Sequence, residues 1–333
     1  MASWNIAIVG ASTLVGEAMV ELLQERGFPV EQLFLLDSDE GEGEFVRFNG
    51  KNLTIESISD FDWSSANLAF FVGGNELSSQ YAEQAASSGC LVIDSSSHFA
   101  DNPNIPLVVP YINNDVLSDY RNHNIISIAS GIVTQLLRAV FAVAQPHEIT
   151  QLSVSNLIPA SFYGKAGVDE LAGQSARLLN GLAVENDLFT KQLAFNLLPA
   201  FEQPAYFISE QDIVDQCRRV LGDYQLPVSV DSVNVPVFYG LAQTVRIMTT
   251  YPIMIDDLEQ RIPDNYSIML AEKDDYPTPV TELDSSLTLK IGDVRYSYGV
   301  PEQLQLWTVS DNIRYLGALM AIEAAELLIN EYL

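Results

Sequence analysis

Residues 4–16 read WNIAIVGASTLVG, and this stretch decides the fold of the N-terminal part of the chain. A short apolar run leads into a loop that begins and ends with glycine, and apolar residues at helical spacing follow as far as Gly27. Residues 32–37, QLFLLD, then read as a second apolar strand. Strand, glycine loop, helix and strand in this order are typical of a dinucleotide-binding unit.

The alternation of strands and helices continues along the chain. Strands are expected at 67–72, 91–94 and 125–127, and a helix at 76–88. The strands are almost uniformly apolar, as parallel strands covered on both faces are. The sequence therefore predicts an α/β fold with an N-terminal Rossmann-like parallel sheet.

A different pattern begins near Gly131. An apolar helix at 132–144 leads into an alternating strand at 149–155, and further elements are expected as strands at 230–239 and 287–295 and helices at 165–180 and 210–221. Period-two strands indicate an α+β domain whose sheet is covered on one face. We expect a first domain of residues 1–130 plus a terminal helix at 312–333, and a second domain of residues 131–311.

Composition excludes several classes of partner. The chain has 333 residues and a formal net charge of −28, so binding to nucleic acid or to an anionic membrane surface is disfavoured. No apolar stretch approaches the roughly 18 residues that span a bilayer, and no secretion signal precedes the first strand. With two cysteines in the chain, we expect a cytoplasmic protein without a metal site.

Several motifs, taken in order, resemble the aspartate-semialdehyde dehydrogenase family, and within it the Usg-type paralogues. They are IAIVGASTLVG at 6–16, VGGNELSSQYAEQAASSGCLVIDSSS at 72–97, NIPLVVPYIN at 104–113, GKAGVDELAGQ at 164–174, VNVPVFYG at 233–240 and SDNIRYLGAL at 310–319. The resemblance spans nearly the whole chain. It implies a Rossmann domain, a dimerising substrate domain, NADP, and reversible reduction of an acyl phosphate through a cysteine thioester.

The positions that carry catalysis in the family are substituted here. The resemblance places the nucleophilic cysteine at Gly131 and the histidine base at Leu241, and neither residue has a group that can react. The arginines that bind the substrate carboxylate and the phosphate fall at Asn234 and Ala100, and a lysine falls at Val214. We expect the family activity to be absent, because catalytic residues that act as a unit do not replace one another.

Other residues are weak substitutes for the missing nucleophile and base. Cys90 and Cys217 are expected to be buried, as cysteines in such positions usually are. His98 follows a strand at the edge where ligands bind in parallel sheets, but without a partnered nucleophile a structural or exposed role is the simpler interpretation. His123 and His147 lie in apparent turns and are expected to be exposed.

A nucleotide site is expected around the glycine loop, if one is retained. It comprises Gly10, Ser12, Thr13, Leu14, Val15 and Gly16, with Asp37 at the end of the second strand and Gly164 and Lys165 in a turn that contacts cofactor in the family. Thr13 replaces a glycine that lets phosphate approach the backbone. Asp37 suits a ribose 2′-hydroxyl, and the acidic run at 38–44 would repel a 2′-phosphate, so NAD is favoured over NADP. The alternative is an acidic solvent loop without a ligand.

The functional hypotheses depend on which residues of the family pattern this sequence keeps and which it substitutes. Phe162 and Tyr163 are bulky where the family has small residues, and we expect them to fill part of the old pocket. The first hypothesis is an inactive homologue that keeps the fold and the homodimer and acts by binding a protein partner or a small effector. The alternatives are an oxidoreductase with changed chemistry that uses His98 or Tyr163, and a non-catalytic subunit of a mixed dimer.

Overall fold

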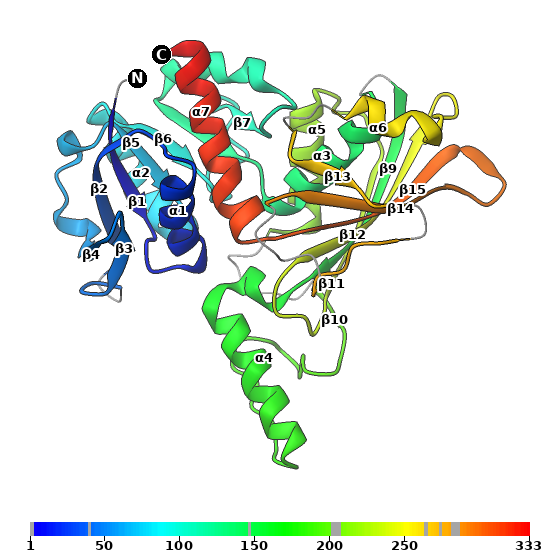
Figure 1. The fold of residues 1–333 in the computed structure, drawn as a ribbon, viewed down its shortest axis with the longest axis horizontal. Helices are drawn as coiled ribbons and strands as arrows, with labels where there is room; N and C mark the ends of the chain where they lie inside the picture. Colours follow the sequence, from blue (N-terminus) through cyan, green and yellow to red (C-terminus); the bar gives the residue numbers. More distant parts are fainter. Residues whose placement is uncertain are drawn as a thin grey trace. The chain divides into compact units, whose positions relative to one another are not determined.

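The computed structural model describes residues 3–38, 41–145, 148–200, 208–262, 266–272, 275–280 and 287–333. The chain divides into two compact units (Figure 1). Unit 1 contains residues 1–130 and 317–333, and unit 2 contains residues 131–316. Each unit has its own sheet. The Rossmann-like parallel sheet and the second α+β domain that the sequence predicts are therefore confirmed.

Unit 1 is built on an eight-stranded sheet in the order β3-β4-β2-β1-β5-β6-β8-β7. The strands are β1 Trp4–Val9, β2 Val30–Asp37, β3 Phe45–Phe48, β4 Lys51–Ser57, β5 Leu68–Phe71, β6 Leu91–Asp94, β7 Leu107–Val108 and β8 Ile125–Ile128. All neighbours pair in parallel except β3 with β4. The strands β5 and β6 lie in the middle of this sheet. They are buried along their whole length, which explains their mostly apolar sequences.

Three helices and several short 3₁₀ segments complete unit 1. They are α1 Leu14–Glu25, α2 Asn75–Ser87 and α7 Met320–Tyr332, with η1 Ile58–Asp60, η2 Trp63–Ser65 and η3 Asn114–Asn122. The α2 helix packs on β5 and β6, while α7 packs on β6 and β8. A bidentate ion pair between Arg26 and Glu326, with N–O distances of 3.1 and 2.5 Å, links the end of α1 to α7.

Unit 2 is built on a seven-stranded mixed sheet in the order β10-β11-β9-β12-β15-β14-β13. The strands are β9 Ile149–Ile158, β10 Leu198–Pro199, β11 Val228–Asn234, β12 Leu241–Thr249, β13 Ile268–Leu270, β14 Leu289–Ser297 and β15 Val300–Ser310. Along β12 the residues alternate: Val245 and Ile247 are fully buried, whereas Arg246 between them is exposed. One face of the sheet is thus covered, as the period-two pattern predicts.

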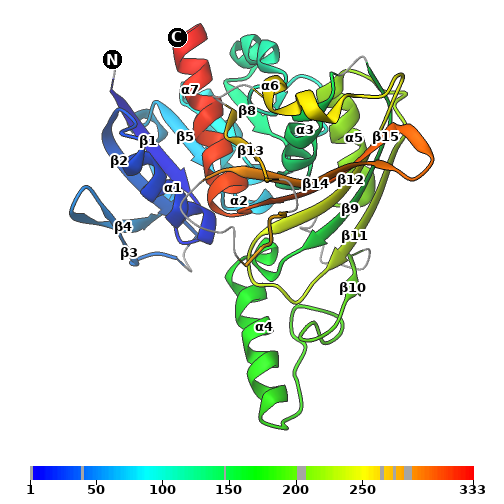
Figure 2. The same cartoon turned by 45° about the vertical axis from the view of Figure 1, so that its right-hand side comes forward.

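The helices of unit 2 are α3 Gly131–Val143, α4 Gly164–Leu179, α5 Glu210–Leu221 and α6 Leu258–Arg261, with η5 Ala160–Tyr163 and η7 Ile255–Asp257. The apolar α3 lies against β12, β14 and β15 and also contacts α5 and α6 (Figure 2). The α4 helix extends away from the sheet, and the chain returns along it. Gln174, on α4, fastens the returning chain by accepting from the amides of Leu193 and Ala194 at 2.8 and 3.0 Å.

Three local predictions need correction. The strand expected at 230–239 ends at Asn234, because Pro236 follows and has no amide to donate to a sheet. The terminal helix expected from 312 starts with a π-helical segment, Arg314–Leu319, and becomes α-helical at Met320. The β3–β4 hairpin was not predicted, although its turn carries the sequence Asn49-Gly50, with φ of 47° and 79°, which is a strong hairpin signal.

Within the described residues, no helix is long and apolar enough to cross a bilayer.

Candidate functional site

The loop between β1 and α1 is shaped by close backbone packing. Gly10 has φ of +90°, and a Cβ built on it would lie 2.3 Å from Cα of Gly73. A Cβ on Gly16 would lie 2.2 Å from the carbonyl oxygen of Gly10. No side chain fits at either position. The two glycines therefore fix the tight turn and the close approach of helix to strand.

Thr13 caps helix α1. Its Oγ1 accepts a hydrogen bond from the amide of Gly16 at 3.0 Å and donates to the carbonyl oxygen of Gly10 at 2.7 Å. A donor at the helix N-terminus is thereby already satisfied by the protein. Leu14 and Val15 form the first turn of α1, where amides have no acceptor within the helix. The loop thus offers fewer donors to a phosphate than a glycine at position 13 would leave.

Asp37 is held by the same loop. Its Oδ2 accepts from the amide and the hydroxyl of Ser12 at 2.9 and 2.7 Å, and its Oδ1 accepts from the amide of Ser38 at 2.8 Å. The side chain of Asp37 is buried. A Cβ built on Gly41 would lie 2.8 Å from Oγ of Ser12. The backbone at Gly41 therefore packs closely against the contact between Ser12 and Asp37. Residues 39 and 40, in the acidic run, lie outside the described residues.

The two positions at which the sequence resemblance predicts a nucleophile and a base are apolar in unit 2. Gly131 begins α3, and a Cβ built there would lie 3.2 Å from Cβ of Leu316. Leu241, the first residue of β12, is fully buried. Its carbonyl oxygen accepts a hydrogen bond from Nε2 of Gln135 at 3.2 Å. Leu316 thus packs closely against Gly131, and the side chain of Leu241 is a buried alkyl group.

A network of neutral polar groups surrounds Gln135. Its Nε2 donates to Oγ1 of Thr308 at 3.0 Å, and its Oε1 accepts from the hydroxyl of Ser310 at 2.5 Å. Nearby, Nε2 of Gln243 donates to the carbonyl oxygen of Ile132 at 3.0 Å and to Oδ1 of Asn156 at 2.9 Å. All these side chains are buried. Because buried amides and hydroxyls are costly when unpaired, this pairing stabilises a closed interior.

Tyr163 lies beside Asn234. Its hydroxyl donates to Oδ1 of Asn234 at 2.7 Å, and its ring meets that of Phe189 edge-on, with centroids 5.0 Å apart. Tyr163 and Asn234 are both buried, and Nδ2 of Asn234 has no hydrogen-bond partner among the described residues. Phe162, next to Tyr163, is half-buried. The side chain at position 234 is thus neutral and covered by Tyr163.

The sequence resemblance predicts binding positions at four further residues, and the structure describes all of them. Ala100 is buried in a turn after β6, and Val214 is half-buried in α5. Gly164, with φ of +69°, opens α4, and Lys165 after it is exposed. The glycine loop belongs to unit 1, whereas Gly164 and Lys165 belong to unit 2.

The cysteines are buried, as predicted. Both are fully inaccessible, and burial raises the pKa of the Cys90 thiol and of the Cys217 thiol to about 12. A thiol with such a pKa is protonated near neutrality and is a poor nucleophile. Neither can stand in for the missing cysteine.

Of the histidines, the structure describes His98 and His123, and neither is paired with a nucleophile among the described residues. His98 is exposed, and its ring lies 4.6 Å, between centroids, from that of Phe99. His123 is exposed, as predicted, and His147 lies outside the described residues.

A buried carboxylate at the carboxyl end of strand β6 in unit 1 was not predicted. Asp94, the last residue of β6, is fully inaccessible and accepts from the hydroxyls of Ser78 and Ser96 at 2.6 and 2.8 Å. Burial raises its pKa to about 6, against the lowering effect of the serine hydrogen bonds and of His98. The signal in the sequence is an aspartate that ends an apolar strand and precedes three serines.

Gln135 was also not predicted as a central residue. A glutamine in the middle of an apolar helix is the signal that was available, because a buried amide must find partners. Asn312 plays a similar part: its Oδ1 accepts from the hydroxyl of Ser161 at 3.1 Å and from the amide of Gly240 at 2.9 Å. Its partners are distant in sequence, so no local pattern identifies them.

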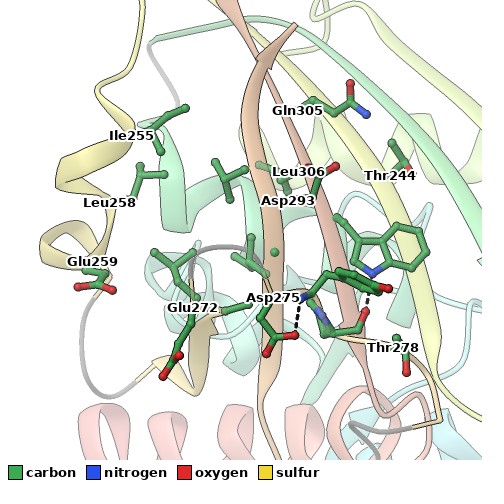
Figure 3. A pocket seen from close by; sticks show the side chains of 18 of the residues that line it. Thr244, Ile255, Leu258, Glu259, Glu272, Asp275, Thr278, Asp293, Gln305 and Leu306 are labelled. Atoms are coloured by element: carbon green, nitrogen blue, oxygen red, sulfur yellow. Dashed lines mark hydrogen bonds between the residues drawn. The ribbon is translucent and has the colours of Figure 1, made fainter.

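Unit 2 also contains a cavity of about 1030 Å³ at one end of its sheet (Figure 3). Its apolar wall includes Leu258, Leu306 and the ring of Trp307, whose Nε1 donates to the carbonyl oxygen of Pro277 at 2.7 Å. Glu272 and Asp275 are among the carboxylates around it. None of the residues predicted to be functional lines this cavity.

Comparisons with known proteins agree with the motifs. Models of a semialdehyde dehydrogenase NAD binding domain and dimerisation domain match residues 5–120 and 142–315. Aspartate-semialdehyde dehydrogenase 2 of Vibrio cholerae is 39% identical over 99% of this chain and 98% of its own. A USG-1 protein homolog of Pseudomonas aeruginosa is 34% identical, with 99% and 98% covered. The crystal structure of aspartate semialdehyde dehydrogenase II from Vibrio cholerae superposes with a TM-score of 0.93 over 100% of both chains, at 38% identity.

Proposed function

The chain belongs to the semialdehyde dehydrogenase family, and we propose that it is a member without the family's phosphorylating dehydrogenase activity, which acts by binding. One observation carries the proposal. The positions of the nucleophile and the base are Gly131 and Leu241, and both lie in apolar packing. Reduction through a thioester needs a thiolate to attack the acyl phosphate and a base to take its proton.

The substrate anchors are absent in the same way. Neither Asn234 nor Ala100 carries the positive charge that a carboxylate or a phosphate requires. Tyr163 covers Asn234, and no cationic side chain takes part in the network around Gln135. A single replacement of Gly131 by cysteine would therefore not supply a binding site for the substrate.

The test is an assay for oxidation of aspartate semialdehyde with phosphate and with NAD or NADP, followed by absorbance of the reduced nucleotide. We expect no turnover above that of buffer. A Gly131→Ala variant purified in parallel is the control, because activity of a contaminating enzyme is the same in both preparations. Phosphate-dependent turnover that belongs to this chain and is lost in the variant would overturn the proposal.

A nucleotide site in unit 1 is the second part of the proposal, with NAD favoured over NADP. Asp37 ends β2 beside the glycine loop, in the position from which an acid can accept from a ribose 2′-hydroxyl. Carboxylates around it repel a 2′-phosphate. Isothermal titration of the nucleotide-free protein with each dinucleotide tests this: we expect binding of NAD and none of NADP, and the reverse order would refute it.

Changed redox chemistry is the competing function. It requires a group that can exchange a proton with a substrate, for which His98 and Tyr163 are the candidates. The hydroxyl of Tyr163 already donates to Asn234 and is buried, and this observation favours the non-catalytic proposal. Reduction of NAD by a panel of aldehydes, lost on changing His98 to Ala, would favour the competitor.

We further propose that the protein forms a cytoplasmic homodimer through unit 2, since this unit contains the match to a dimerisation domain. Native mass spectrometry should give twice the chain mass. A mixed dimer with an active paralogue is the alternative, and a second chain of different mass in the purified complex would identify it. A protein partner or a small effector would be the molecule on which the binding function acts.

A further inference from the structure

The contact between Ser12 and Asp37 joins the ends of two neighbouring strands. Val9 pairs with Leu36 in the parallel register, so the loop that starts at Gly10 meets the carboxyl end of β2. Ser12 then donates twice to one oxygen of Asp37, from its amide at 2.9 Å and from its hydroxyl at 2.7 Å. We call this arrangement the Ser12–Asp37 clasp.

The clasp uses most of the hydrogen-bonding capacity of the carboxylate. A carboxylate has about four acceptor positions, two on each oxygen. Both positions on Oδ2 are taken by Ser12, and one on Oδ1 is taken by the amide of Ser38 at 2.8 Å. A single acceptor position is left on Oδ1. A ribose with two adjacent hydroxyls needs two acceptor positions to bind this side chain through both.

The surroundings prevent the carboxylate from simply turning outward. The side chain of Asp37 is only 5% exposed. The backbone at Gly41 approaches the clasp so closely that a Cβ would lie 2.8 Å from Oγ of Ser12 and 3.0 Å from Cβ of Asp37. A ribose that binds through both of its hydroxyls can use the remaining position on Oδ1 for one of them, and the other must take the place of the Ser12 hydroxyl on Oδ2.

We propose that Ser12 is a specificity-determining residue, whose hydroxyl competes with the ribose hydroxyls of an NAD-type dinucleotide for Asp37. The inference rests on the proposed nucleotide site in unit 1 and adds to it the residue that limits its affinity. In the free protein the hydroxyl of Ser12 satisfies the carboxylate. On binding, it rotates away and the ribose takes its position, so part of the binding free energy replaces an existing hydrogen bond.

The chemistry predicts a difference between nucleotides. The ribose of NAD can donate from both its 2′- and its 3′-hydroxyl, whereas the ribose of NADP keeps only the 3′-hydroxyl and its 2′-phosphate is repelled by the carboxylate. Removing the hydroxyl of Ser12 should thus help only a ligand with a free 2′-hydroxyl. A change that merely widened the site would help both nucleotides.

The experiment is isothermal titration of wild-type protein and Ser12→Ala with NAD and with NADP. We expect Ser12→Ala to bind NAD about tenfold more tightly than wild type, as one competing hydrogen bond is removed, and NADP to bind to neither protein. Equal NAD affinity in the two proteins overturns the inference, and so does an equal gain for both nucleotides.

A matched control exists in the same unit. Ser64 also donates from its amide and its hydroxyl to one carboxylate oxygen, Oδ1 of Asp62, at 3.0 and 2.8 Å, on the exposed turn of η2. Ser64→Ala removes the same kind of hydroxyl away from the glycine loop, and NAD affinity should equal that of wild type. If it rises as in Ser12→Ala, the effect is not local and the inference is wrong.

Two further variants separate the possible failures. In Asp37→Ala the additional change Ser12→Ala should give no gain in NAD affinity, since the shared acceptor is gone. Ser12→Gly removes the hydroxyl by a second route if Ser12→Ala does not fold, as judged by circular dichroism. If wild type binds NAD but both Ser12 variants bind it equally well, only the inference fails. If no folded variant binds either nucleotide at millimolar concentration, the proposed nucleotide site fails with it.

Discussion

The glycine loop of unit 1 and the region around Gly131 in unit 2 are held in place by different kinds of contact. The loop keeps its backbone shape, because Gly10 and Gly16 leave no room for a side chain. The region around Gly131 is held instead by side chains, namely the buried Leu241 and a neutral polar network. Backbone contacts determine the shape of the first region, and side-chain packing and hydrogen bonds determine the second.

The two regions also differ in charge. Unit 1 has two buried carboxylates at the ends of strands, Asp37 and Asp94, each held by serine hydroxyls. The network around Gln135 consists of amides and hydroxyls. We therefore expect backbone packing and pH to govern the stability of the first region, and hydrogen-bond pairing to govern the second.

The largest effect is expected from Gly16→Ala, which puts a Cβ 2.2 Å from the carbonyl oxygen of Gly10. Because backbone cannot yield as a flexible side chain can, the free energy of unfolding should fall by at least about 3 kcal/mol. Gly173→Ala is the control: a Cβ there meets nothing within 4 Å, and helix propensity should raise stability by about 1 kcal/mol. Urea unfolding of both variants measures this, and equal effects would contradict the comparison.

The next effect is a dependence on pH. The pKa of Asp94 is raised from 3.8 to about 6, so the folded state holds this proton more tightly than the unfolded state. Its stabilising contribution is complete below pH 3.8 and is lost as pH rises through about 6, a change of up to about 3 kcal/mol. Asp94→Asn stays neutral and lacks this loss.

The measurement for Asp94 is the free energy of unfolding of wild type and Asp94→Asn at pH 4 and pH 7. The variant should gain up to about 3 kcal/mol relative to wild type between these pH values. A constant difference between the two proteins would show that Asp94 does not titrate in this range and that charge does not distinguish the two regions.

A smaller effect is expected in unit 2 from Tyr163→Phe. It removes the donor to Asn234 and leaves a buried amide oxygen unpaired, at a cost of about 1–3 kcal/mol. Asn234→Leu alone removes the acceptor of this hydrogen bond from the tyrosine hydroxyl. The double variant should be less destabilised than the sum of the two, as an apolar pair replaces the bond. Additive losses in thermal unfolding would mean that Tyr163 does not stabilise this region through Asn234.

The smallest effect is expected at the surface of unit 1. The side chains of Arg26 and Glu326 are 33% and 28% exposed, so their ion pair contributes about 0.5–1 kcal/mol at low salt. Arg26→Ala should lower stability by that amount in 20 mM buffer and by less in about 1 M salt, where charges are screened. A larger, salt-independent loss would place α1 and α7 among the tightly packed parts of the unit.

Elements with a strong local pattern could be predicted from the sequence. The helix expected at 132–144 is α3 at Gly131–Val143, because its apolar residues face neighbours on nearly all sides. The strand expected at 91–94 is β6, with the same limits. The strand at 230–239 was too long, since periodicity does not detect the end that Pro236 imposes.

The site could be predicted only in part. The proposed loss of nucleophile and base rests on the sequence alone, because glycine and leucine have no reactive group in any fold. The hydrogen bonds that surround these positions could not be predicted from the sequence. Gln135 and Ser310 are 175 residues apart, and Tyr163 and Asn234 are 71 apart. No local pattern relates such residues.

By itself, the sequence determined the α/β and α+β classes of the two units, the family, and the residue types at positions 131 and 241. Only the tertiary structure decided which polar groups are paired: Ser12 with Asp37, and Gln135 with Ser310. The reason is physical. Hydrophobic periodicity acts between residues a few positions apart. A buried hydrogen bond depends on strand register and packing, which bring distant residues within about 3 Å of each other.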